Sequence, residues 1–177
     1  MRVDPPSGPP VEPVECLAHP GHAGPAVTFA DLTTTRVGGP IADYCEVGTE
    51  AEFIDAVREA DDAERPLLVI GGGSNLLASD EAFDGVVVRD MRTGIEADTH
   101  SGCNGALIQL PAGQPWDHFV AEAVYSGWMG VEALSGIPGS VGAVPIQNVG
   151  AYGQEVSETL ASARVWDRAE ARTRLFP

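Results

Sequence analysis

Three consecutive glycines interrupt the apolar segment LLVIGGGSNLLAS, which runs from Leu67 to Ser79. The four apolar residues before the glycines predict a short buried strand over residues 67–70. Glycine loses more conformational freedom on folding than any other residue, so three in a row are costly unless the backbone needs unusual angles or must let another group approach closely. The segment therefore predicts a strand that ends in a loop with a specific task.

The glycine loop has four interpretations. A P-loop requires a lysine, and all ten basic residues of this chain are arginines. A Rossmann fingerprint requires a glycine where Leu76 stands, and the chain between Asn75 and Gly85 leaves little room for a full crossover helix. The loop can instead form a nest whose N–H groups converge on a diphosphate, assisted by Ser74 and Asn75. Taken alone, it fits a tight turn without a ligand equally well.

A second glycine-rich stretch favours a ligand. The segment SGIPGSVGAVPIQNVGAYG, Ser135 to Gly153, combines glycines and prolines with many apolar residues, which is not the composition of a linker. It predicts a buried, ordered loop whose backbone polar groups need partners. A flat ligand rich in hydrogen-bonding groups, such as an isoalloxazine ring, would supply them, and glycine permits its close approach. The alternative is an irregular core loop that is satisfied by its own turns.

Charge and composition exclude several classes of protein. The net charge of −16 repels nucleic acid and anionic membranes, so neither is an expected partner. No apolar run reaches the length of a membrane helix, and the N-terminus lacks the apolar core of a signal peptide, which favours a cytoplasmic protein. The widely spaced Cys16, Cys45 and Cys103 predict reduced thiols and no metal site.

The hydrophobic pattern predicts an α+β fold with two mixed lobes, over residues 28–93 and 94–177, after a proline-rich disordered tail over residues 1–27. In the first lobe we expect strands over 41–47, 67–70 and 85–90, a helix from the N-cap Thr49 to about Ala63, and one helical turn over 75–77. In the second we expect paired strands in GIEAD and ALIQLPAG, a helix over 116–125 that ends near Gly127, and a strand in ASARVWD.

Five segments together resemble a known family. TTTRVGGPIADY, VIGGGSNLL, LPAGQPW, VEALSGIPGSVGA and PIQNVGAYGQEV occur in this order, and the similarity covers residues 31–167. They resemble the N-terminal half of the UDP-N-acetylenolpyruvoylglucosamine reductases (MurB), flavoenzymes of peptidoglycan synthesis. Thr33 departs from the pattern, since many relatives have asparagine there. The resemblance implies an FAD-binding fold of the PCMH or vanillyl-alcohol-oxidase type, truncated at its C-terminus and without the substrate-binding domain that follows in relatives.

The resemblance also implies which residues contact FAD. The flavin is expected to be non-covalent, because neither glycine-rich stretch contains a histidine or cysteine. His100 and His118 are expected at the surface. The diphosphate is expected at the glycine loop, Gly113 at a strand end beside it, and the adenine and isoalloxazine groups along the second stretch: Gly71, Gly72, Gly73, Ser74, Asn75, Leu76, Gly113, Ser135, Gly136, Ile137, Pro138, Gly139, Ser140, Gly142, Asn148, Gly150, Ala151, Tyr152 and Gly153.

The reaction implied by the resemblance is the NADPH-dependent reduction of UDP-N-acetylenolpyruvoylglucosamine to UDP-N-acetylmuramate. The family's catalytic arginine in a G-Y-R-x-S motif, its serine proton donor and its late glutamate have no counterpart here. We therefore expect the catalytic residues beyond Pro177 and no turnover by this chain alone, and we expect Arg164, Arg168, Arg172 and Arg174 at a solvated strand edge. Two alternatives remain: another FAD-dependent oxidoreductase of the same fold, and a nucleotide-binding module without catalysis.

Overall fold

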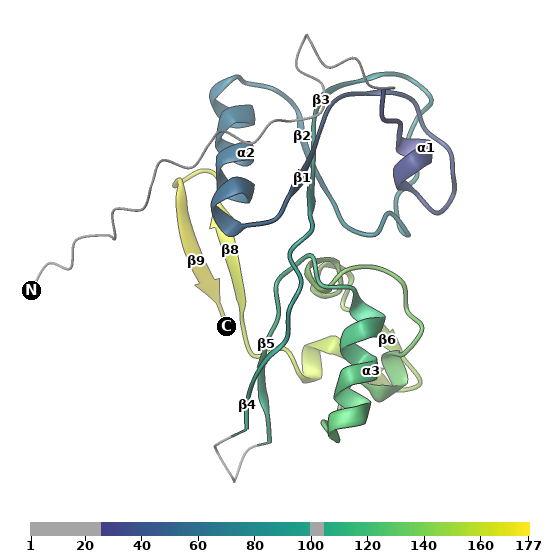
Figure 1. The fold of residues 1–177 in the computed structure, drawn as a ribbon, viewed down its shortest axis with the longest axis vertical. Coiled ribbons are helices and arrows are strands. Elements are labelled where there is room, and N and C mark those ends of the chain that lie inside the picture. Colours follow the sequence, from purple (N-terminus) through teal and green to yellow (C-terminus); the bar gives the residue numbers. More distant parts are fainter. Residues whose placement is uncertain (1–25, 100–104) are drawn as a thin grey trace, which may run out of the picture.

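The computed structural model describes residues 26–99 and 105–177 and shows a mixed fold of helices and strands (Figure 1). Its helices are α1 (Phe29–Leu32), α2 (Glu50–Asp62) and α3 (Trp116–Ser126), with short 3-10 helices at Glu132–Leu134, Val141–Ala143, Pro145–Gln147 and Val156–Glu158. Its strands are β1 (Ile41–Val47), β2 (Leu67–Ile70), β3 (Phe83–Asp90), β4 (Glu96–Asp98), β5 (Leu107–Gln109), β6 (Gly150–Ala151), β7 (Gln154–Glu155), β8 (Ala163–Asp167) and β9 (Arg172–Phe176).

A parallel sheet in the order β1-β3-β2 organises one end of the molecule. In the central strand β3, Val87 lies opposite Tyr44 of β1 and Leu68 of β2. Successive side chains of a strand point to opposite faces. One face, with Val88, packs on α2, and the other face, with Val87, packs on α1, so the middle of β3 is buried on both sides. This sheet is what holds the start of the glycine loop in place.

Helix α2 begins where the sequence predicts. The side chain of Thr49 accepts a hydrogen bond from Glu52 N, and Glu52 Oε2 accepts one from Thr49 N (3.0 Å), which forms a capping box. The helix buries Ala56, Val57 and Ala60, and two of these, Ala56 and Ala60, pack in the cluster on the sheet face. These local signals confirm the predicted helix.

A second core lies around α3, at the other end of the molecule from the parallel sheet (Figure 1). Trp116, Phe119, Val120 and Ala123 of α3 are buried together with Leu134 and other apolar residues. Helix α3 ends at Gly127, whose φ of +75° allows the left-handed C-cap that the sequence predicts. The antiparallel pair β4–β5 leads into this part, and its pairing is confirmed.

Two tryptophans with a buried indole N–H, Trp116 of this core and Trp166 of β8, allow a paired test. The Nε1 of Trp116 donates to the carbonyl oxygen of Leu134 at 3.1 Å, whereas the buried Nε1 of Trp166 has no acceptor in the described part of the chain. Trp116→Phe should therefore lower the free energy of unfolding by about 0.5–1.5 kcal/mol more than Trp166→Phe, because only the first removes a buried hydrogen bond. Urea unfolding of both variants measures the difference. Equal losses would show that the Trp116 bond adds nothing.

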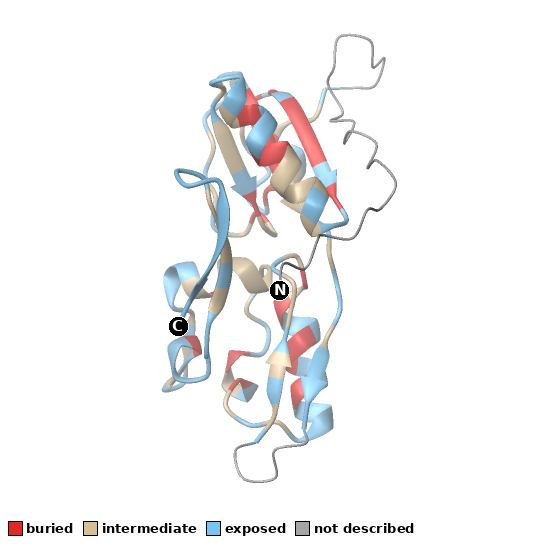
Figure 2. Cartoon of the chain, turned by 90° about the vertical axis from the view of Figure 1, so that its left-hand side faces the viewer, coloured by how far each residue is buried: buried red, intermediate tan, exposed pale blue. Residues whose placement is uncertain are grey.

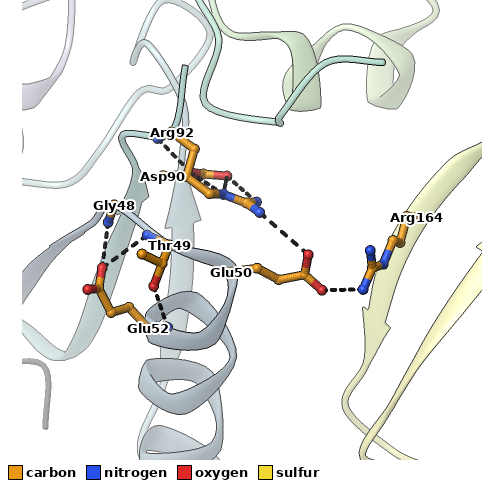
Figure 3. A network of polar contacts seen from close by, with 7 residues as sticks. All are labelled: Gly48, Thr49, Glu50, Glu52, Asp90, Arg92 and Arg164. Carbon is orange, nitrogen blue, oxygen red and sulfur yellow. Dashed lines mark hydrogen bonds and ion pairs between the residues drawn. The ribbon is translucent and has the colours of Figure 1, made fainter. Parts of the chain in front are cut away.

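The hairpin β8–β9 lies beside α2, although the two are far apart in sequence (Figure 1). Figure 3 shows the contact at the N-terminal end of α2: Arg164 Nη2 lies 2.7 Å from Glu50 Oε1, and Glu50 Oε2 lies 3.9 Å from Arg92 Nη1. Arg92 also binds Asp90, at the end of β3 (2.6 Å). At the other end of α2, Arg168 pairs with Asp61, and this hydrogen bond lowers the pKa of Asp61. Exposed ion pairs add little free energy, so these contacts fix the placement of the hairpin more than its stability.

Several sequence-based expectations are wrong. Residues 75–77 form no helical turn; a turn at Ser74 and Asn75 is followed by irregular backbone. Helix α1 and strand β9 were not predicted. The four arginines do lie on the exposed C-terminal hairpin, but each of them is ion-paired: Arg164, Arg168, Arg172 and Arg174.

The second glycine-rich stretch is ordered, but it is not buried. Figure 2 shows much of this region in the colours of intermediate and exposed residues. Within Ser135–Gly153 only Val144 is buried, while Ile146 is 83% exposed and Tyr152 97% exposed. Ile137, Val141, Val149 and Ala151 pack against the same core as Val144, but from its surface, so each keeps part of its side chain exposed.

One cysteine also differs from expectation. Cys45 in β1 is buried and disulfide-bonded, so the prediction of reduced thiols is wrong for this residue. The other two cysteines, the tail over residues 1–25 and His100 lie outside the described residues. His118 is exposed, as predicted. The division between lobes at residue 93 stays a prediction.

Candidate cofactor-binding site

The glycine loop leaves the carboxyl end of β2, the edge where parallel strands in open α/β sheets bind ligands. Arg89 of the neighbouring strand β3 lies opposite Ile70, the last residue before the loop. Glu46 of β1 lies opposite Arg89 on the other side. The loop therefore begins at an edge where the ends of β1 and β3 bring two polar side chains together.

Each glycine of the loop stands where a side chain would meet a neighbour. A Cβ on Gly71 would lie 2.6 Å from Ser140 Oγ, and a Cβ on Gly72 would lie 3.1 Å from the Cα of Gly139. Gly73 has a φ of +68°, and a Cβ there would overlap the carbonyl oxygen of Leu32. The bare backbone lets the loop pack between α1 and the second glycine-rich stretch. The two stretches noted in the sequence are thus in contact.

The loop offers free hydrogen-bond donors. Within residues 26–99 and 105–177, the backbone N–H groups of residues 72–75 have no protein acceptor, although Gly73 itself is buried. Its carbonyl is occupied, since Thr34 N donates to Gly73 O at 3.1 Å, and the Ser74 hydroxyl donates to Pro138 O at 3.4 Å. A buried N–H without a partner is costly, and successive free N–H groups in a tight loop form an anion-binding nest. The loop fits the diphosphate of a nucleotide cofactor.

The second glycine-rich stretch forms a wall opposite the glycine loop, and backbone hydrogen bonds hold this wall in place. The N–H of Trp116 donates to Gly139 O at 3.0 Å, and that of Gly142 donates to Ala112 O at 2.8 Å, where a Cβ on Gly142 would lie 2.6 Å from the Ala112 Cβ. On the other side of Pro138, Asp117 Oδ1 accepts from Gly136 N (2.6 Å) and from the Ser135 hydroxyl (3.2 Å). Helix α3 therefore positions this wall against the glycine loop.

Other expected cofactor residues are engaged in contacts of their own. Leu76 and Ile137 pack against two different core clusters, and a Cβ on Gly113 would collide with the carbonyl of Asp90. Asn148 Nδ2 donates to Glu155 Oε2 at 2.7 Å, which ties the start of the β6–β7 hairpin. In the described structure no recorded hydrogen bond joins the hairpin residues to the glycine loop: Gly150, Ala151, Tyr152 and Gly153.

A cavity of about 670 Å³ opens beside the loop, between it and α1. Sequence reasoning did not assign roles to its polar lining, although the segment TTTRVGG was among those that carry the resemblance. The lining consists of Ala30, Asp31, Leu32, Thr33, Thr34, Arg36, Gly72 and Arg89. Two cationic side chains thus share a cavity with the middle glycine of the loop.

Tyr44 interacts with Arg89, one of these two cationic side chains. Its hydroxyl donates to Glu46 Oε1 at 2.7 Å and also interacts with Arg89. Burial, together with the bond to Glu46, raises the pKa of Tyr44 to about 12, so the hydroxyl stays protonated at neutral pH and keeps donating. In the described part of the chain, no three His, Cys, Asp or Glu residues gather to hold a metal ion.

A parallel sheet, a glycine loop with free N–H groups and a second glycine-rich wall against it define a nucleotide-cofactor-binding domain. The chain belongs to the FAD binding domain family, which matches residues 40–174. This confirms the predicted FAD-binding fold and FAD as the cofactor of the family.

The most informative relatives are UDP-N-acetylenolpyruvoylglucosamine reductases. The chain is 50% identical to that of Cutibacterium acnes over 153 residues, which is 86% of this chain and 40% of the relative. It is 49% identical to that of Thermobifida fusca over 150 residues, 85% of this chain and 42% of the relative. The chain therefore spans about two fifths of the length of these relatives, and it corresponds to their FAD-binding portion.

Two solved structures are also similar to this chain. The reductase MurB from Thermus caldophilus superposes with a TM-score of 0.67 and 28% identity, over 86% of this chain and 51% of that one. A solvent-stable cholesterol oxidase superposes with a TM-score of 0.50 and 17% identity, over 84% of this chain and 31% of that one, which shows a shared fold alone.

Proposed function

We propose that the chain is the FAD-binding portion of an NADPH-dependent UDP-N-acetylenolpyruvoylglucosamine reductase that makes UDP-N-acetylmuramate for peptidoglycan. The observation that carries the proposal is the contact between the two glycine-rich stretches, Gly72 against Gly139, beside a row of N–H groups without protein acceptors. The 50% identity to a reductase over most of the chain supports the substrate.

Each part of the cradle has a separate task in this proposal. The N–H groups of Gly72 to Asn75 bind the diphosphate, where fixed dipoles replace water without reorganising. Gly139 and Ser140 close the opposite side and let the cofactor approach the backbone. The remainder of the second stretch, from Val141 to Gly153, lines the ring systems. Bound FAD would supply the hydride chemistry, while the protein binds and orients it.

The net charge of the chain supports a proposal about its partners and its location. A net charge of −16 disfavours nucleic acid and anionic lipid surfaces, and we propose a cytoplasmic location. None of the helices in the described ranges is both long and apolar enough to span a membrane. We assign no catalytic residue within this chain, because no arginine or serine here stands in the motif that carries catalysis in the resembling family.

The cofactor can be identified directly. The purified chain is reconstituted with an equimolar mixture of FAD, FMN and NAD, washed, denatured by heat, and the released compound is identified by chromatography. We expect FAD, because FMN lacks the diphosphate that the loop fits and NAD lacks the isoalloxazine ring. Retention of FMN in place of FAD, or of no flavin by a folded sample, would contradict the proposal.

The substrate is tested on the product of the complete gene. NADPH oxidation should depend on added UDP-N-acetylenolpyruvoylglucosamine, and chain 1–177 alone should show none. Flavin binding combined with substrate-independent oxidation in the complete product would favour another oxidoreductase of the same fold. Flavin binding without any oxidation would favour a module without catalysis.

A further inference from the structure

Six of the nine arginines in the described part of the chain are paired with carboxylates. Every described arginine except Arg36, Arg58 and Arg89 has a carboxylate oxygen within 4.0 Å. With 26 acidic residues against 10 basic ones, an arginine that avoids them is unusual. Arg58 is exposed on α2, but Arg36 and Arg89 both line the cavity beside Gly72. Neither cavity arginine forms an ion pair within 4.0 Å in the described part of the chain, although Glu46 lies opposite Arg89 on the neighbouring strand.

Arg89 is positioned by the sheet. It lies on β3 directly opposite Ile70, after which the glycine loop begins, and it is half-buried. The Arg89 side chain also interacts with the Tyr44 hydroxyl. Because a strand side chain has few rotamers against packed neighbours, the guanidinium is held near the start of the loop. Holding a cation in this way lowers the entropy lost when an anion binds.

Arg36 is positioned by the turn after α1. The N–H of Arg36 donates to Thr33 O at 3.2 Å, and the Thr33 hydroxyl donates to Val37 O at 3.3 Å. The same turn is joined to the glycine loop by the bond from Thr34 N to Gly73 O. Arg36 has a φ of +54°, a left-handed conformation that costs a non-glycine residue about 1–2 kcal/mol. The turn that carries Arg36 is thus linked directly to the glycine loop.

The cavity also contains one acid, Asp31. Its Oδ2 accepts bonds from the N–H of Thr28 (2.9 Å) and from the Thr28 hydroxyl (2.6 Å), and these bonds lower the pKa of Asp31. The carboxylate is therefore ionised but already bound at the start of α1. With Asp31 bound in this way, the two guanidinium groups give the cavity that Gly72 lines a net positive charge.

We propose that Arg36 and Arg89 bind the diphosphate of the cofactor from the cavity side and supply the positive charge that a lysine supplies in a P-loop. The inference rests on the proposed FAD binding and deepens it. The N–H groups of the nest orient the diphosphate. The two arginines neutralise its two negative charges by charge-assisted hydrogen bonds, which are about twice as strong as neutral ones. A nest with partial charges alone would leave those charges uncompensated in a strongly acidic protein.

The test compares Arg36→Gln and Arg89→Gln with Arg58→Gln, which removes the third unpaired arginine away from the cavity. Dissociation constants of FAD (by flavin fluorescence) and of ADP (by calorimetry) are measured at low and high salt. We expect each cavity variant to weaken both ligands by roughly tenfold to a hundredfold and to flatten the salt dependence. Arg58→Gln should change neither.

A charge-preserving variant separates charge from folding. Arg36→Lys and Arg89→Lys should recover part of the lost affinity, whereas a merely structural defect would not respond to charge. Cavity variants that bind FAD and ADP as the Arg58→Gln control does would overturn the proposal, even with FAD bound by the parent chain. A parent chain that binds ADP with arginine dependence but rejects FAD would support the diphosphate site and contradict the flavin function.

Discussion

Gly72→Val is expected to weaken FAD binding about a hundredfold or more while leaving the protein folded. A Cβ on Gly72 would lie 3.1 Å from the Cα of Gly139, so a β-branched side chain would separate the two glycine-rich stretches and cover the free N–H groups. Titration of the chain with FAD, followed by flavin fluorescence, measures the effect, and circular dichroism checks that the variant is folded.

Gly48→Val is the matched control for this experiment. A Cβ on Gly48 has only an ordinary contact with Glu52 Oε2, at 3.7 Å, and the residue lies before α2 and outside the cavity lining. It should bind FAD as the parent does. If Gly72→Val did so too, the glycine loop would not be where the diphosphate binds.

The largest expected effect on stability is that of Gly73→Ala. A Cβ here would overlap the carbonyl oxygen of Leu32, a backbone atom that cannot rotate away, and the residue has a φ of +68°. Conformational strain and overpacking together should lower the free energy of unfolding by about 3–4 kcal/mol. Chemical denaturation followed by circular dichroism gives this value.

Gly127→Ala separates the two causes. Gly127 has a similar φ of +75°, but a Cβ there would meet nothing within 4 Å. It should therefore cost only the strain, about 1–2 kcal/mol. Equal losses for the two alanine variants would mean that the turn after α1 yields easily and is not pinned to the glycine loop.

Local signals made much of the fold predictable. The capping box of Thr49 and Glu52 fixed the start of α2, and Gly127 marked the end of α3, because each acts through bonds within one helical turn. The apolar run Leu67–Ile70 gave β2 for the same reason. Helix α1 was missed because four residues carry no periodicity, and β9 because its side chains are exposed and show no alternation.

The site was predictable in its residues but not in its assembly. The loop at Gly71–Ser74 and the wall at Gly139–Ser140 were both expected to contact the cofactor, yet their contact with each other depends on how α3 packs, which no local pattern encodes. The cavity arginines were missed for a related reason. Their significance is that neither forms an ion pair with a carboxylate, and this is visible only when all the ion pairs of the described residues are placed.

The most direct test of the account is a crystal structure of the chain with FAD. We predict that diphosphate oxygens lie within about 2.7–3.2 Å of the N–H groups of Gly72 to Asn75, with Gly139 on the other side of the loop and the guanidinium groups of Arg36 and Arg89 turned toward the same oxygens. A diphosphate bound elsewhere, with the N–H groups of the loop hydrogen-bonded only to water, would contradict it.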